Sequence, residues 1–252
     1  TADILSTTAA VLITLSISVY IFVGAAIPRP LWIFGTIGVS SALVIAAAVL
    51  IDTSDQNSFI RLLLAGLLTS AVSRGSGLIG AVSSGYDHGR WLSRVETVTE
   101  LGVVVGGDMY EASPLYILFW MIPNVIFGDL VPVTAIRFVS IAAATGFPLI
   151  VFAVLSVVTE SRRIGMIGFA LTISQPLLLR TAMLSESEIL AMYWFSLAVL
   201  GLAAAVKTQT RRWTLFCAAL TISAIALHFL YGVIVIVTVA ATMATIILIN
   251  SK

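Results

Sequence analysis

Long apolar runs, separated by short polar links, dominate the chain. A helix rises about 1.5 Å per residue, so roughly 20 apolar residues cross the hydrocarbon core of a bilayer, which is about 30 Å thick. The runs lack the polar alternation expected of strands in a membrane barrel. Eight runs are therefore predicted to be membrane-spanning helices: Ala9–Ile27, Leu31–Ile51, Phe59–Val82, Pro132–Val158, Ile164–Ala182, Ile189–Val206, Trp213–Phe229 and Leu230–Ile249.

The stretch from Ser83 to Ser113 is the one sizeable polar segment. It carries seven of the 25 charged residues, together with one of the two histidines. Its apolar residues recur at helical spacing, and polar residues fill the opposite side of the same helix. These apolar positions are Trp91, Val95, Val98 and Leu101. The pattern predicts a helix that lies in the membrane interface rather than across the bilayer.

Composition turns a helical prediction into a membrane prediction. The chain is 60% hydrophobic and only 10% charged, with a mean hydropathy of +1.11, whereas soluble domains carry about 25% charged residues. This excludes an ordinary cytosolic enzyme, a secreted disulfide scaffold and a nucleic-acid-binding protein. The predicted fold class is an all-α polytopic membrane protein with about eight transmembrane helices, embedded in a lipid bilayer. The lone Cys217 cannot pair within the chain.

Basic residues near the last spans favour one orientation. If these spans alternate, six of the basic residues fall on one side, which the positive-inside rule assigns to the cytoplasm. The turn Ser185–Glu188 and His228 then face outward. The six residues are Arg162, Arg163, Lys207, Arg211, Arg212 and Lys252.

The side on which the polar segment lies depends on Pro114–Gly128. This stretch is apolar, but its 15 residues reach only about 22 Å as a helix, and Pro123 interrupts it. If it crosses the bilayer, Asp87 is cytoplasmic and lies opposite Glu188; if it does not, both acids face outward. Counting lysines and arginines favours crossing, whereas length and Pro123 favour the second arrangement, which we adopt.

Two acidic positions are candidates for chemistry. Asp87 stands beside His88 and Arg90; it could cap the helix that follows or act as a general base at the membrane face, and the residues alone leave both open. Glu186 and Glu188 precede a span, where acids complement the helix dipole. Two glutamates at the mouth of an apolar helix exceed what capping requires, which favours a functional role.

Three arginines, Arg74, Arg137 and Arg180, lie within or just inside apolar runs. Each alone is best explained by a side chain that reaches toward the interface, but facing outward together they could form a basic collar for a phosphate. His228 is better explained as a buried, hydrogen-bonded histidine, although an outward position leaves a ligand role open. Gly75–Gly80 matches a dinucleotide-binding pattern but ends a membrane helix, so no nucleotide site is expected.

The order and spacing of several motifs between about Phe59 and Val239 resemble the GT-C superfamily of membrane glycosyltransferases. The first motifs lie in or near the polar segment, and the next ones lie at the beginning of the following span. The last motif falls where aminoarabinose- and mannosyltransferase-like members of the superfamily have their second acid. They are Tyr86-Asp87-His88-Gly89-Arg90-Trp91, Ser113-Pro114-Leu115-Tyr116 with Glu111 before it, Phe127-Gly128, Ile136-Arg137-Phe138 and Glu188-Ile189-Leu190.

The sequence departs from the superfamily pattern at several points. Ser113 replaces the first of two prolines, and the second acid is Glu188 rather than aspartate. Two extra spans precede the core, and the usual C-terminal region is missing. We therefore expect N-terminal membrane helices over residues 1–58 and a GT-C-like core over residues 59–252, with an external loop at 83–131. We also expect the chain to be a piece of something larger.

The resemblance implies transfer of a sugar from a polyprenyl-phosphate donor to a lipid, glycan or protein acceptor at the outer face of the plasma membrane. It makes Asp87 the general base, and it makes Glu188 the second acid, which positions the acceptor or the base. It assigns stabilisation of the leaving phosphate to an outward arginine. The remaining residues assigned to substrate binding are His88, Arg90, Glu111, Glu186 and His228, beside Arg74, Arg137 and Arg180.

No cofactor is required by this reaction, although some relatives use a divalent cation that two carboxylates and a histidine could support. No metal-ligand spacing in the sequence demands one. Two other functions stay open. The chain could be a transporter or lipid flippase, although no internal repeat is evident. It could also be a non-catalytic membrane subunit that works with other subunits in a larger complex.

Overall fold

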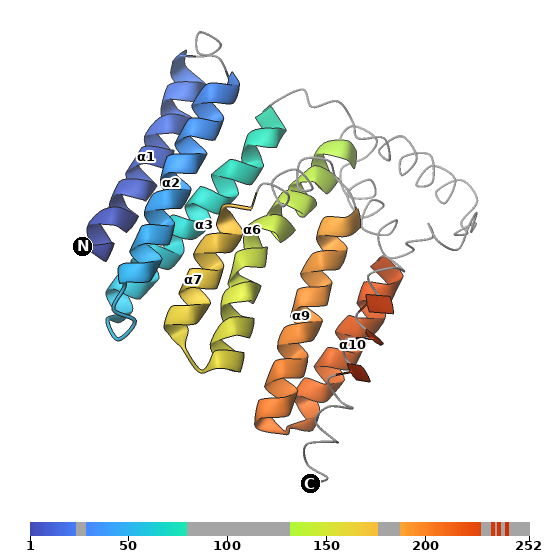
Figure 1. The fold of residues 1–252 in the computed structure, drawn as a ribbon. Helices are drawn as coiled ribbons and strands as arrows, with labels where there is room; N and C mark the ends of the chain where they lie inside the picture. The colour runs from blue at the N-terminus through green and yellow to red at the C-terminus, as the bar shows by residue number, and fades with distance from the viewer. Residues whose placement is uncertain are drawn as a thin grey trace. The chain divides into compact units, whose positions relative to one another are not determined.

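A computed structural model describes residues 1–23, 29–79, 132–175 and 187–227, and short pieces at 233–234, 236–237 and 240–241. The regular elements of these residues are all α-helices, and no strand is found among them, so the all-helical class is confirmed for this part of the chain (Figure 1). They are α1 (Ala2–Val23), α2 (Arg29–Leu50), α3 (Gln56–Ile79), α6 (Pro132–Thr159), α7 (Arg162–Ile173), α9 (Ser187–Thr208) and α10 (Arg211–Leu227).

Two helical stretches in the described ranges are long and apolar enough to cross a membrane. Ser140–Thr159 of α6 has a mean hydropathy of 2.4, and Leu190–Thr208 of α9 has a mean hydropathy of 1.7. Shorter apolar helical stretches occupy Ala2–Ser16 and Gly35–Leu50. These helices support association with a membrane, and the figure of about eight spans stays a prediction.

The expected span from Ile164 to Ala182 is wrong as one continuous helix. Helix α7 ends at Ile173 after 12 residues, a length of about 18 Å that is too short to cross the hydrocarbon core. Gln175 donates its backbone N–H to the Thr172 carbonyl at 3.3 Å in a closing turn, and the next residue is Pro176, which disfavours helical backbone at the position before it. Residues 176–182 lie outside the described ranges.

The helices fall into two compact units. The first contains α1, α2, α3, α7 and the part of α6 from Ile141 onward. The second contains α9, α10 and the beginning of α6.

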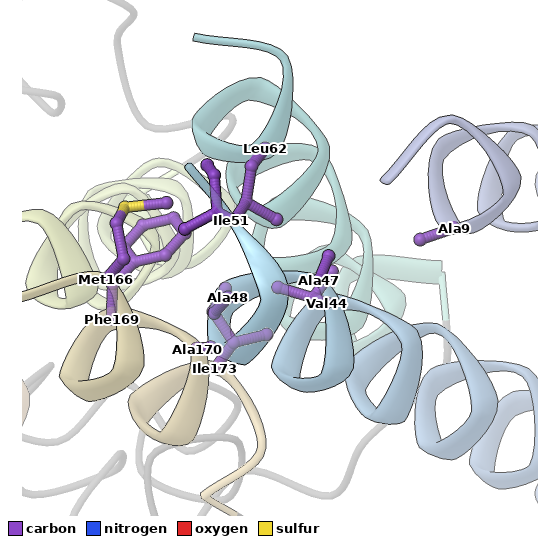
Figure 2. Close-up of a cluster of buried hydrophobic side chains, with 10 residues drawn as sticks. All are labelled: Ala9, Val44, Ala47, Ala48, Ile51, Leu62, Met166, Phe169, Ala170 and Ile173. Carbon is purple, nitrogen blue, oxygen red and sulfur yellow. The ribbon is translucent and has the colours of Figure 1, made fainter. Parts of the chain in front are cut away.

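Helices α2, α3 and α7 build most of the core of the first unit. Each of the three contacts the other two, and α1 packs against α2 and α3. Figure 2 shows the buried side chains at this junction, with Ala170 and Ile173 of α7 beside Ala48 of α2. The cluster consists of Ala9, Val44, Ala47, Ala48, Ile51, Leu62, Met166, Phe169, Ala170 and Ile173.

A glycine lets α3 and α7 approach closely. A Cβ atom added at Gly66 would lie 2.8 Å from Cζ of Phe169 and 2.9 Å from Cδ1 of Ile173, closer than real Cβ atoms approach their neighbours. Phe169 is fully buried, so its ring has little room to move aside. The contact between α3 and α7 therefore requires that Gly66 carry no side chain.

Left-handed residues close the two helical hairpins. Glu160 (φ 57°) joins α6 to α7, and Gln209 (φ 52°) joins α9 to α10, as is common for the residue that follows a helix. Beyond the first turn, Arg163 Nη2 donates to the Val49 carbonyl at 2.7 Å. The α6–α7 turn and the loop between α2 and α3 therefore lie at the same end of the first unit.

The second unit is built on the α9–α10 hairpin. Ala198 is fully buried there, with Trp194, Phe195 and Leu220 packed against it. A Cβ atom at Gly201 would lie 3.2 Å from the Cα atom of Cys217, so these helices also meet through a small residue.

The close approach at Gly66 gives a stability prediction. Gly66→Ala should lower the free energy of unfolding by about 1–3 kcal/mol because the added methyl overpacks the contact with Phe169. Gly35→Ala is the matched control, since a Cβ atom there meets nothing within 4 Å, and it should stabilise by about 0.5–1 kcal/mol through helix propensity. Thermal unfolding in detergent measures both, and equal effects of the two substitutions would contradict the packing.

The start of α3 gives a prediction about pH. Asp55 accepts hydrogen bonds from the Ser58 hydroxyl at 2.5 Å and the Asn57 N–H at 3.0 Å, and these bonds, the Ser58 bond most, lower the pKa of its carboxyl below 3.8. The stabilisation is therefore present above pH 3.8 and is lost as pH falls through the lowered pKa. Asp55→Ala should lower the thermal midpoint at pH 7, and its difference from wild type should shrink in acid.

Asp55→Asn is the control for this titration. Asparagine also caps helices well but does not ionise, so this variant should stay closer to wild type at pH 7 and show a weaker acid dependence. A gap between wild type and Asp55→Ala that is the same at pH 7 and pH 3 would show that the ionised carboxylate does not stabilise α3.

Candidate functional site

Among the residues that the sequence singles out, Arg74 alone has a described side chain. Arg137 lies in α6 and Glu188 at the start of α9, and the structure describes only the backbone of these two. The other seven lie outside the described ranges: Asp87, His88, Arg90, Glu111, Arg180, Glu186 and His228. That Asp87 and Glu188 share an outer aqueous vestibule therefore stays a prediction.

Arg74 is the largest fully buried side chain among the described residues, with 1% of its surface exposed. It lies on α3, five residues before that helix ends at Ile79. Burial of a guanidinium without a counter-charge is costly, because the ion loses its hydration and gains no equivalent attraction. Such a residue within an apolar bundle is a candidate for function.

Neutral oxygen atoms surround the guanidinium. Arg74 Nη1 donates to the Ser70 hydroxyl at 2.7 Å and lies 3.4 Å from both the Ser70 carbonyl and the Ser73 hydroxyl. From α7, the Thr172 carbonyl accepts from Nη2 at 3.4 Å. The Nε atom is buried and has no hydrogen-bond partner. One donor of the fork is therefore unused, and most of the remaining bonds are long.

The side chain of Arg74 runs along its own helix. Ser70 precedes Arg74 by four residues, so the guanidinium points back toward the N-terminus of α3. It ends at a buried position between α3 and α7. That Arg74 reaches toward the membrane interface stays a prediction.

Charge is unbalanced around Arg74 within the described part of the first unit. Helix α3 carries an ion pair between Arg61 and Asp3 at 3.6 Å. Arg61 lies 13 residues before Arg74 on that helix, a distance of about 20 Å along its axis. The contacts of Arg74 are hydroxyls and carbonyls rather than carboxylates. An anion that reached this position would meet a cation with a free N–H donor.

The two ends of α7 place Arg74 relative to the basic turn. Arg163, in the first turn of α7, contacts the end of α2, whereas Arg74 contacts Thr172 in the last turn. Nine residues separate positions 163 and 172, or about 14 Å along the helix. Arg74 is therefore displaced from the Arg162–Arg163 end toward the end of α3 that continues into the polar segment.

Sequence reasoning missed the residues that hold Arg74. Ser70 could have been found, because it lies four residues before Arg74 and therefore on the same face of a helix. Ser73, one residue before Arg74, had no such signal. Thr172 had no local signal, since it is 98 residues away along the chain. Only the packing of α3 against α7 brings its carbonyl to the guanidinium.

Metal ligands do not gather in the described ranges: no group there of three or more histidine, cysteine, aspartate or glutamate residues could hold an ion. The side chains considered for a divalent cation, Asp87, His88 and Glu188, are not among those described. Support for a cation therefore stays a prediction.

Burial of Arg74 without a carboxylate among its described contacts predicts a gain in stability when the charge is removed. Arg74→Met keeps an unbranched side chain and should raise the free energy of unfolding by on the order of 1 kcal/mol, as replacement of buried charges often does. Arg212→Met, at an exposed position, is the control and should change it by less than about 0.5 kcal/mol. Thermal unfolding in detergent measures both, and a clear loss of stability in Arg74→Met would assign Arg74 a structural role.

Known proteins offer no further guide to this chain. No protein-family model, no curated protein and no solved structure matches it. The resemblance of its motifs to the GT-C superfamily therefore stays a prediction, and function has to be argued from the residues themselves.

Proposed function

We propose that this chain is a GT-C-type glycosyltransferase that moves a sugar from a polyprenyl-phosphate donor to an acceptor at the outer face of the plasma membrane. The observation that supports this most is the burial of Arg74, at 1% exposure, with neutral oxygens as its partners. Only eight residues after α3 ends, the chain reaches Asp87. Along the sequence, this cation and the candidate base therefore lie on either side of the residue at which α3 ends.

The chemistry of the donor suits this arrangement. A polyprenyl tail needs the bilayer, and its phosphate needs cations that are shielded from water, where a charge-assisted hydrogen bond is strongest. The unused Nε donor of Arg74 would bind a phosphate oxygen. Arg137 and Arg180 are proposed to complete the basic collar.

In the proposed reaction, Asp87 takes the proton from an acceptor hydroxyl or amine as that atom attacks the anomeric carbon. The new bond forms as the bond from the sugar to the phosphate oxygen breaks, and the polyprenyl phosphate leaves with the electron pair. Attack from the face opposite the leaving group inverts the anomeric carbon. The arginines stabilise the charge that grows on the departing phosphate.

The other proposed residues bind and orient the substrates. Glu188 positions the acceptor or the base, and the polar residues near the two acids complete the site, with a divalent cation as an optional addition. These residues are His88, Arg90, Glu111, Glu186 and His228. The sidedness rests on the positive-inside rule for the Arg162–Arg163 turn, which it assigns to the cytoplasm. The outward side of the polar segment rests on the short length of Pro114–Gly128 and on Pro123.

A transporter or flippase is the second candidate, and the depth of Arg74 favours it. Its guanidinium bonds to Ser70 and does not point to the end of the helix. A charge that lines a transport pathway would lie at a similar depth. A transporter would move a lipid-linked substrate across the bilayer without breaking a bond. A non-catalytic subunit would do neither alone. Measurement of transfer and of translocation on one preparation distinguishes the three.

The proposed base gives the direct test. Purified protein in vesicles is given a polyprenyl-phosphate sugar, and product formation is compared between wild type, Asp87→Asn and Asp108→Asn. Loss of the general base in Asp87→Asn should slow transfer by about 10²–10⁴-fold. Asp108→Asn is the same change in the same polar segment and should leave the rate within about twofold of wild type. Asp108 has no assigned role, and substitutions away from such features are usually mild. Transfer by Asp87→Asn at the wild-type rate would exclude Asp87 as the base.

A further inference from the structure

A groove runs between α1 and α3 in the first unit. Its volume is about 460 Å³, within the range of sites that hold ligands, about 300–1,000 Å³. Val11 and Leu15 line the α1 side, and Leu64 and Leu68 line the α3 side. All four are substantially exposed, so the groove opens outward from the helices and its walls are not sealed by the rest of the unit.

Two of the hydroxyl groups on the walls of the groove are bonded within α1. Thr14 donates its hydroxyl hydrogen to the Ala10 carbonyl at 2.8 Å, and Ser6 donates to the Asp3 carbonyl at 3.1 Å. Because these hydrogens are already used within α1, they are not offered to a ligand. The groove therefore suits a hydrocarbon chain rather than a polar molecule.

One end of the groove is basic. Arg61 lines it and is 61% exposed, with Asp3 as its ion-pair partner at 3.6 Å. At this length and exposure the pair is weak, and a guanidinium carries five N–H donors, more than this one carboxylate contact uses. Asp55 also lies close enough for Arg61 to contribute to the lowering of its pKa, after the hydrogen bonds from Ser58 and Asn57.

The position of Arg61 matches that of a lipid headgroup. It lies in the second turn of α3, near the loop between α2 and α3, and the Arg163–Val49 bond joins that loop to the basic α6–α7 turn. The positive-inside rule assigns this end to the cytoplasm, the side where the membrane surface is rich in anionic lipids. An apolar groove that begins at such an arginine has the two parts that a phospholipid requires.

We propose that the groove between α1 and α3 binds an anionic phospholipid of the cytoplasmic leaflet, with an acyl chain along Val11, Leu64 and Leu68 and its phosphate at Arg61. The site is separate from the residues proposed for sugar transfer. It depends on the orientation of the first unit and not on the reaction. A bound lipid would fill the space between two helices that contact each other but leave a furrow at their surface.

The test counts lipids on the purified protein. Protein in mild detergent is titrated with phosphatidylglycerol or with phosphatidylcholine of the same acyl chains, and bound lipid is resolved by native mass spectrometry. Phosphatidylglycerol should bind more tightly. Arg61→Gln should weaken its binding about fivefold, as expected for one basic side chain at an anionic surface, and Arg61→Lys should recover most of the loss. Arg212→Gln, which removes an exposed charge on α10, should not change it.

Two threonines of α1 provide a matched pair for the groove itself. Thr14 and Thr8 are both exposed, and each bonds to the carbonyl four residues earlier, but only Thr14 lines the groove. Thr14→Phe should fill the groove and reduce bound phosphatidylglycerol at least fivefold, whereas Thr8→Phe should leave binding unchanged. Because the two substitutions add the same bulk to one helix, a general effect on folding would appear in both.

Three results would overturn the proposal. Equal binding of phosphatidylglycerol by Thr14→Phe and Thr8→Phe would exclude the groove as the binding site. If wild type and Arg61→Gln each bound the two lipids with equal affinity, the contact between Arg61 and the headgroup would be excluded. A photoreactive residue at position 14 that crosslinks to another protein chain, and not to lipid, would show that a helix occupies the groove. The proposal is supported if Thr14→Phe loses bound phosphatidylglycerol and Arg61→Gln loses the preference for phosphatidylglycerol over phosphatidylcholine.

Discussion

Satisfaction of polar groups within each helix is the constraint on which the rest of this structure depends. In hydrocarbon an unpaired N–H or C=O group costs several kcal/mol, so a chain this apolar can cross the bilayer only as helices that close their own hydrogen bonds. Hydroxyl side chains follow the same rule: Thr14, Thr69 and Thr159 each donate to the carbonyl four residues earlier. The outer faces of the helices can then be apolar, and small residues decide where helices meet.

Arg74 departs from this rule, and function is inferred from that departure. Its guanidinium bonds to neutral oxygens of α3 and α7, and its Nε has no partner. A protein selected only for stability would place methionine or leucine there. Retention of a buried cation is expected where its charge is needed for an anion, because active sites commonly sacrifice stability for activity.

Much of the fold could be predicted from apolar length. The run predicted over Pro132–Val158 forms a helix over Pro132–Thr159, and the run predicted over Ile189–Val206 lies within Ser187–Thr208. Length alone failed at α7, because Ser174 and Gln175 before Pro176 end the helix inside an apolar stretch. The candidate site was harder to predict, since the partner Thr172 reaches Arg74 only through packing of helices distant in sequence. Apolar patterns encode which segments are helices but not which polar atoms those helices bring together.

The central claim, that the polar segment and the start of α9 share the outer side of the membrane, is tested most directly by the accessibility of single cysteines. Buried Cys217 is first replaced by alanine, and cysteine is introduced at Ser84 or Ser187. In vesicles of known orientation, a membrane-impermeant thiol reagent should label both positions from the outer face. Labelling of the two positions from opposite faces would place Asp87 and Glu188 on different sides of the bilayer and contradict the proposed enzyme.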